Sequence, residues 1–247
     1  MTPTPASASA GAIGNVSANV KGARVRHFHE QLQELLATVS RMGTLAGSMV
    51  HGAVLGLIAR DESLTQEVFD KEHEVNQLQV RVDDTAVRLT ALQQPVAQDV
   101  RFLFMASRIG GELERIADQA INICQNAHFV LQAPPLKPLV GLPVMAEVAE
   151  NMVRDAMAAM MGRDVALAER ILEQEQKVDA HRDQIFRVLL THMMADPATI
   201  QRALSLILIA RNLERVGDHA TNVAEEVIYW IQGRDVRHTK PNPVPAV

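Results

Sequence analysis

Apolar residues recur every three or four positions along most of the chain, which is the spacing of one face of an α-helix. This pattern predicts six helices and offers no good strand candidate. Prolines mark two of the junctions, because Pro95 and Pro197 each stand where one helix should stop and the next can begin. The predicted helices span residues 24–59, 64–92, 96–131, 144–161, 165–194 and 198–232.

The segment APPLKPLVGLP at residues 133–143 holds four prolines and one glycine, which is incompatible with a helix interior and predicts a linker. It separates two predicted three-helix units, residues 24–132 and 144–233. Residues 1–23 lack a charged region followed by an apolar one, so they predict a disordered tail and not a signal peptide. Residues 234–247 are rich in proline and predict a C-terminal tail.

The two units repeat one another. LERIADQAIN at 113–122 and LERVGDHATN at 213–222 agree at six of ten positions, with an offset of 100 residues. Upstream, EHEVN at 72–76 resembles EQKVD at 175–179. Such duplication indicates two copies of one structural unit, which can bury their apolar faces against each other. The sequence therefore predicts an all-α fold of two tandem three-helix bundles.

Composition supports a helical, soluble protein. Hydrophobic residues make up 47% of the chain but aromatic residues only 3%, a balance that favours helices packed on helices. The net charge of −5 argues against a nucleic-acid binder, which normally shows a basic face. The single cysteine, Cys124, excludes an intramolecular disulfide, as suits a reducing cytoplasm, and is expected to pack in the core.

One stretch is apolar enough to raise the question of a membrane span. Residues 42–59 carry no formal charge, yet seven of these 18 residues are Gly, Ser, Thr or His. Within the stretch, apolar residues recur at helical spacing, so we expect a soluble amphipathic helix and no membrane span. These apolar residues are Met42, Leu45, Met49, Ala53 and Leu57.

Acidic residues form a duplicated stripe at the edge of the apolar helix faces. In the third and sixth helices the spacing is i, i+4, i+8, which aligns the side chains along one side, and Glu226 extends the second stripe. The second and fifth helices offer matching pairs one turn apart, and antiparallel packing would bring the pairs and stripes together. Clustered carboxylates repel one another unless cations or protons compensate them, and all-oxygen ligand sets suit hard cations such as Mg²⁺, Mn²⁺, Ca²⁺ or iron.

The alternative is that these carboxylates are solvated or paired with arginine, and Arg211 stands three residues before Glu214 as a candidate partner. Duplication of the whole pattern favours cation binding. Catalysis is less well supported, because the chain contains no Glu-x-x-His pair, P-loop or nucleophile elbow. His219 is expected to form a surface or interhelical hydrogen bond, not to bind metal.

Four motifs together resemble the PhoU family: HFHEQLQELLATVSRMG in the first helix, LQQPVAQDVR at the first junction, LERIADQAIN and LERVGDHATNVAEEV. The resemblance covers residues 26–233. It implies a pseudo-twofold axis between the two bundles, and paired acidic motifs that bind metal clusters. It also implies a cytoplasmic, commonly dimeric regulator that connects the Pst phosphate transporter, through its ATPase subunit PstB, to the sensor histidine kinase PhoR and holds the Pho regulon off when phosphate is plentiful.

Carried over to this chain, the resemblance implies divalent or iron cations (Fe, Mn, Mg, Zn or Ca) at two sites. Asn76 stands where the second copy has Asp179 and loses one charge, so the first site is expected to be the weaker. The first site comprises Glu72, Asn76, Glu114, Asp118 and Asn122, and the second comprises Glu175, Asp179, Glu214, Asp218 and Asn222.

The leading functional hypothesis is thus a non-enzymatic negative regulator of the phosphate regulon, without direct contact to nucleic acid. The alternative is a metal-dependent enzyme or a metal-storage helical bundle. A third reading is a purely structural helical repeat whose carboxylates are solvated.

Overall fold

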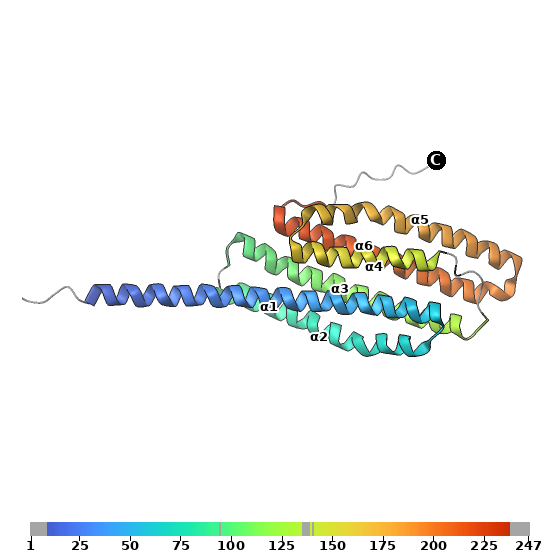
Figure 1. Ribbon diagram of the computed structural model, residues 1–247, viewed down its shortest axis with the longest axis horizontal. Coiled ribbons are helices and arrows are strands. Elements are labelled where there is room, and N and C mark those ends of the chain that lie inside the picture. The colour runs from blue at the N-terminus through green and yellow to red at the C-terminus, as the bar shows by residue number, and fades with distance from the viewer. Residues whose placement is uncertain (1–8, 94, 135–138, 140, 238–247) are drawn as a thin grey trace, which may run out of the picture.

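The protein consists of six long helices, α1 (Ser9–Ala59), α2 (Glu62–Gln93), α3 (Ala97–Leu131), α4 (Leu142–Gly162), α5 (Val165–Ala195) and α6 (Ile200–Gln232), with a short 3₁₀ turn at Pro197–Thr199. The structure is a computed structural model and describes residues 9–93, 95–134, 139 and 141–237. Figure 1 shows the helices lying roughly alongside one another. No strand occurs in these described residues, so the all-α prediction is confirmed.

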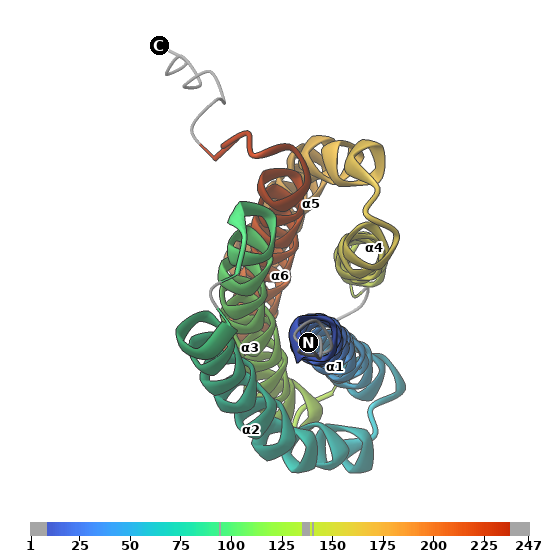
Figure 2. The same ribbon diagram turned by 90° about the vertical axis from the view of Figure 1, so that its left-hand side faces the viewer.

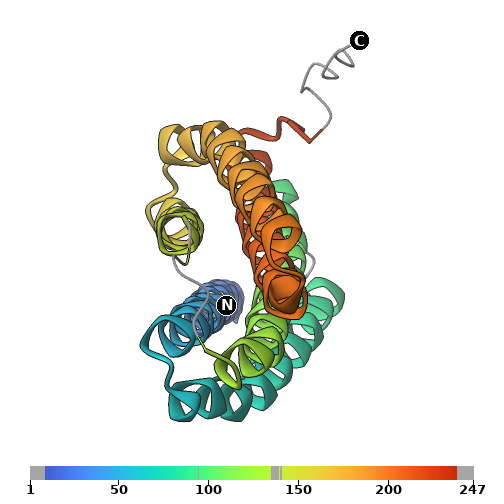
Figure 3. The ribbon, with the colours of Figure 1, turned by 90° about the vertical axis from the view of Figure 1, so that its right-hand side faces the viewer.

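The helices form two three-helix bundles, α1–α3 and α4–α6, which meet through α3 against α6 and through α1 against α4. Figures 2 and 3 show α2, α3, α6 and α5 as one curved layer, with α1 and α4 on its concave side. Equivalent helices of the two repeats thus face each other across the interface, as a pseudo-twofold axis requires. The interface places the LER motifs of both repeats, on α3 and α6, at the centre of the molecule.

Local chemistry explains several helix ends. The Asp164 side chain accepts a hydrogen bond from the Leu167 amide at 3.0 Å and caps the start of α5. Asp196 accepts one from Ala198 at 3.0 Å and caps the 3₁₀ turn that leads through Pro197 into α6. Gly233 ends α6 with a φ of 69°, a conformation that glycine adopts without the strain of a side chain.

Helix α1 is longer than predicted. Residues 9–23, which the sequence suggested were part of a disordered tail, continue the helix, while residues 1–8 lie outside the described residues. Once a helix is nucleated, each added residue costs little, and Ala10, Ala12 and Ala18 are strong helix formers. The C-terminal prediction also changes, because Val236 is buried against the fold; residues 238–247 are not described.

The apolar stretch of α1 lies in the core. Among the described residues, the 26–59 part of α1 is the one helical segment that is long and apolar enough to cross a membrane. Half of its most apolar 18-residue stretch is buried inside the protein. Met42, Met49 and Ala53 are fully buried, and α1 packs on α2, α3 and α4. This is the burial expected of a central helix in a bundle. The predicted linker at 133–143 is only partly described, and α4 begins within it at Leu142.

Candidate functional site

The second acidic cluster forms between α5 and α6. Asp218 is partly buried, and its pKa is raised from 3.8 to about 6, first by burial and then by the nearby carboxylates of Glu214, Glu175 and Asp179. A carboxyl group with negative charges nearby holds its proton more tightly, because its ionisation would add another negative charge to the cluster. The structure therefore brings together four of the five residues that the sequence predicted for this site.

A guanidinium group lies in this cluster. Arg182 of α5 donates hydrogen bonds to Glu214 and, at 3.3 Å, to Asp179, and it also contacts Asp183 at 2.8 Å. The pKa of Arg182 is raised: burial acts against its charge, but the carboxylate partners outweigh burial. The sequence offered Arg211 as the partner of Glu214, and that assignment was wrong. The partner of Glu214 is Arg182, which lies one turn beyond Asp179 on α5, the helix that packs against α6.

The first acidic cluster is smaller. Glu114 of α3 is partly buried, and its pKa is raised first by burial and then by Asp118, with a further contribution from Glu72 of α2. Asn76 is exposed on α2. Asn122 is partly buried, and its backbone carbonyl accepts a hydrogen bond from Asn126 at 2.7 Å. Three of the five predicted residues thus lie within electrostatic reach of one another.

Asn222 contacts the opposite repeat. Its side-chain amide donates to Glu112 of α3 at 2.9 Å, and His219 Nδ1 lies 2.8 Å from the same carboxylate oxygen. Burial acts to raise the pKa of Glu112, but the hydrogen bonds from His219 and Asn222 outweigh it and hold the pKa below the usual value. The expected interhelical role of His219 is confirmed, and Asn222 lies in the seam between α3 and α6.

Sequence reasoning missed Glu112 because its counterpart in the second repeat is Asn212, so the position is not duplicated. The difference between Gln119 and His219 was the available signal, since a histidine in one copy alone suggests a local partner. Glu226 was also misread. It does not extend the acidic stripe but pairs with Arg108 of α3 at 2.8 Å.

The carboxylates have the chemistry of a hard-cation site, but the side chains are not gathered into a coordination shell. Within the described residues, no group of three or more His, Cys, Asp or Glu side chains lies close enough to hold a metal ion. In the second repeat, a cation would have to replace the Arg182 guanidinium at Asp179 and Glu214. Metal binding by the two clusters therefore stays a prediction.

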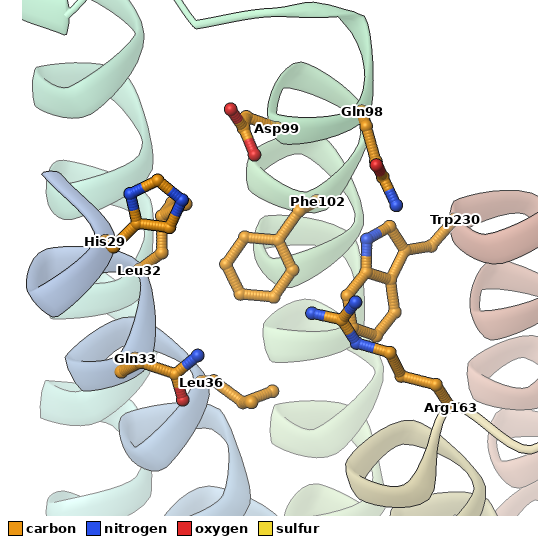
Figure 4. A pocket seen from close by; sticks show the side chains of 9 residues that line it. All are labelled: His29, Leu32, Gln33, Leu36, Gln98, Asp99, Phe102, Arg163 and Trp230. Atoms are coloured by element: carbon orange, nitrogen blue, oxygen red, sulfur yellow. The ribbon is translucent and has the colours of Figure 1, made fainter. Parts of the chain in front are cut away.

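A separate hollow of about 310 Å³ opens at one end of the molecule and is lined by both repeats (Figure 4). The Phe102 and Trp230 rings pack with centroids 5.1 Å apart, and the Arg163 guanidinium lies 4.8 Å from the centre of the Trp230 ring. Arg163 ends α4 in the left-handed region, with a φ of 51°. Sequence patterns do not reveal this hollow, since its residues come from the middle of α1, the start of α3 and the ends of α4 and α6, which are distant in the chain.

Comparison with known proteins gives a consistent result. The PhoU domain family model matches residues 39–127 and 142–227, one match in each bundle. The chain is 35% identical over 215 residues to the phosphate-specific transport system accessory protein PhoU homolog of Zymomonas mobilis, covering 87% of this chain and 91% of the relative. It is 33% identical over 226 residues to phosphate-specific transport system accessory protein PhoU of Escherichia coli K12, covering 91% of each.

Solved structures agree with the sequence matches. The crystal structure of PhoU from Pseudomonas aeruginosa superposes with a TM-score of 0.81 at 33% identity, covering 84% of this chain and all of that one. The phosphate transport system regulatory protein PhoU from Streptococcus pneumoniae gives a TM-score of 0.77 at 25% identity, covering 85% of this chain and 99% of that one. Both the sequence and the two-bundle fold thus match along nearly the full length of these relatives, and the chain belongs to the PhoU family.

Proposed function

We propose that this protein is a cytoplasmic, non-enzymatic accessory protein of phosphate uptake that acts as a negative regulator of the Pho regulon. The observation that carries the proposal is the family match in both repeats, together with relatives named as accessory and regulatory proteins of phosphate transport. The alternative of a metal-dependent enzyme or a metal-storage bundle is not favoured by these relatives.

The proposed partners are the transporter ATPase PstB and the sensor kinase PhoR, and the protein is proposed to act as a homodimer. Exposed apolar side chains support a role in protein binding. Val100 and Phe104 of α3 are exposed, as are their equivalents Ile200 and Leu204 of α6. Exposed apolar residues gathered on a surface commonly mark sites of protein association. The negative net charge supports indirect control of transcription, through the kinase and not through DNA.

Cation binding by the two acidic clusters is part of the proposal. Its support is the set of four carboxylates between α5 and α6, where burial and then the charges of Glu214, Glu175 and Asp179 raise the pKa of Asp218. The residues that would hold a cation are Glu175, Asp179, Glu214 and Asp218 in the second repeat, and Glu72, Glu114 and Asp118 in the first. A bound cation would neutralise the clusters and fix α5 against α6 and α2 against α3.

Deletion of the gene tests the regulatory role. Phosphate-starvation genes should stay on in phosphate-rich medium, and this expression should disappear when the kinase gene is also deleted. A transcriptional reporter for a starvation gene measures both effects, and the intact gene supplied on a plasmid is the control. Normal repression in the deletion strain, with no second PhoU-like protein present, would refute the proposal. Derepression that persists without the kinase would refute only the route through PhoR.

A further inference from the structure

A charged hollow lies in the seam between the two repeats, apart from both acidic clusters. Its volume is about 420 Å³, and it is bordered by α3, α6 and the segment that follows α6. Three guanidinium groups and three carboxylates line it, so its formal charges balance. These are Arg108, Arg115 and Arg237, and Glu112, Glu225 and Glu226.

The arginines retain hydrogen-bonding capacity. The Arg108 guanidinium stacks 4.5 Å from the centre of the Phe104 ring and donates to Glu226 Oε1 at 2.8 Å. In the described part of the chain this is the one hydrogen bond recorded for its five N–H groups. The Nη1 atom of Arg115 lies 3.6 Å from Glu112, which is an ion-pair distance too long for a good hydrogen bond. Two guanidinium groups at this hollow can therefore donate hydrogen bonds to further acceptor oxygens.

Glu226, in contrast, has a carboxylate oxygen that lacks a hydrogen-bond donor. The residue is only 6% exposed, and among the described residues its Oε2 atom is buried without a hydrogen-bond partner. A buried, unpartnered carboxylate oxygen is costly, and proteins rarely tolerate one without a ligand or an ordered water to supply the donor. Arg237 does not meet this need, because its Nη1 atom lies 3.7 Å from Oε1, the oxygen that Arg108 already contacts. The hollow thus combines unused donors with an acceptor that lacks a donor.

We propose that this hollow binds inorganic phosphate in its hydrogen phosphate form. The ionised oxygens of that anion accept from the Arg108 and Arg115 guanidinium groups, and guanidinium groups bind such oxygens strongly. Its remaining O–H group donates to the Glu226 carboxylate. Sulfate has no O–H group at neutral pH, and a fully ionised phosphate monoester has none either, so both leave Glu226 without a donor. The volume exceeds that of one small oxyanion, so waters would share the hollow.

The inference deepens the proposed regulatory function, on which its biological meaning rests, by assigning a place where the protein itself senses phosphate. The bound anion would contact α3 of one repeat through Arg108 and Arg115, and α6 of the other through Glu226. It would also lie beside Arg237, in the segment that follows α6. Occupancy would therefore tie the two bundles and the C-terminal segment together, which gives a physical route from phosphate level to partner binding.

Isothermal titration calorimetry on the full chain tests the proposal, in EDTA at pH 7.5 so that metal cannot mediate binding. Inorganic phosphate, sulfate and methyl phosphate, a monoester that has no O–H group once it is fully ionised, are titrated at equal ionic strength. We expect phosphate to bind at least about tenfold more tightly than the other two, since a site built around a ligand hydroxyl discriminates against analogues that lack it. Equal affinity for phosphate and sulfate, or no phosphate binding, overturns the proposal.

Two variants and a matched control locate the site. Glu226→Gln offers an N–H group where the carboxylate offers an oxygen, so the preference for phosphate over sulfate should fall toward one. Arg115→Gln, at an exposed position, should weaken phosphate binding about tenfold. Arg215→Gln, at the equivalent exposed position of the second repeat, makes the same charge change outside the hollow and should leave affinity unchanged.

Circular dichroism and thermal melting confirm that each variant is folded. If Glu226→Gln fails to fold, Arg115→Gln against Arg215→Gln still decides the question. Equal loss of affinity in these two variants, or in neither, overturns the assignment. The regulatory proposal is tested separately by gene deletion. Derepression in the deletion strain without phosphate binding in the calorimeter would therefore reject this inference alone.

Discussion

Replacing Asp218 by asparagine should stabilise the metal-free protein at neutral pH, although the residue lies in the candidate site. Asparagine keeps the shape of the side chain and removes the charge that Glu214, Glu175 and Asp179 oppose. The rise in pKa from 3.8 to about 6 corresponds to about 3 kcal/mol for a fully buried group. Because Asp218 is only partly buried, solvent screening reduces the expected gain in unfolding free energy to roughly 1–2 kcal/mol.

The sign and the pH window follow from the raised pKa. The folded protein holds the Asp218 proton more tightly than the unfolded chain does, so folding is penalised as the pH rises from 3.8 toward 6. The asparagine variant escapes this penalty. Its advantage should be near zero below pH 3.8, about a third of its full value at pH 4.5, and constant above pH 6.

Urea unfolding followed by circular dichroism, with EDTA present, measures this advantage at pH 4.5 and 7.5. Glu173→Gln, an exposed change on α5, removes the same charge outside the cluster and should shift the unfolding free energy by less than about 0.5 kcal/mol. A divalent cation added at pH 7.5 should reverse the order, because it stabilises the wild-type carboxylates. If Asp218→Asn destabilises the metal-free protein, or if its effect is the same at both pH values, the electrostatic description of the cluster is wrong.

Three further predictions concern other parts of the molecule. Arg182→Gln should lower the unfolding free energy of the metal-free protein by about 1–2 kcal/mol. It should also raise the affinity for divalent cations, since it frees the carboxylates of Asp179 and Glu214. An unchanged cation affinity would count against competition between the arginine and the metal. Gly111→Ala should raise the unfolding free energy by about 0.5–1 kcal/mol, because a Cβ there meets no atom within 4 Å. Gly56→Ala should lower it, because its Cβ would lie 2.9 Å from Thr65 Cγ2. Chemical denaturation measures both changes, and changes of the same sign would refute the argument. Arg163→Ala should expose Trp230, the single tryptophan, and shift its fluorescence to longer wavelength, while Arg154→Ala should not.

The helices were predictable because their signals are local. The ends of α2 to α6 fall within a few residues of their predicted positions, since Pro95 and Pro197 restrict the backbone and Gly233 readily adopts the positive φ that ends α6. The exception is α1, whose first residues carry little apolar periodicity. Residues 9–23 continue a helix that is nucleated further along, and periodicity read within that segment alone does not reveal such continuation.

The acidic clusters were only partly predictable, because the partner of a charged side chain is set by packing between helices. Helical spacing placed Glu214 and Asp218 on one side of α6 correctly. It could not show that Arg182 reaches across from α5 while Arg211, closer in sequence, does not. It also could not show that Asn222 turns toward Glu112 of the other bundle, since that contact joins residues 110 positions apart.

The structure also changes how the two acidic clusters compare. The sequence predicts that the first site is the weaker for cations, because Asn76 stands where the second copy has Asp179. Yet the position equivalent to Arg182 in the first repeat is Gln79, which carries no charge and hydrogen-bonds Asp83 at 2.5 Å. Among the predicted ligands, the second cluster therefore has one more carboxylate and one guanidinium to offset it. The two differences cancel in formal charge. A ranking by carboxylate count therefore has no electrostatic basis, and what separates the sites is whether a cation must first displace Arg182.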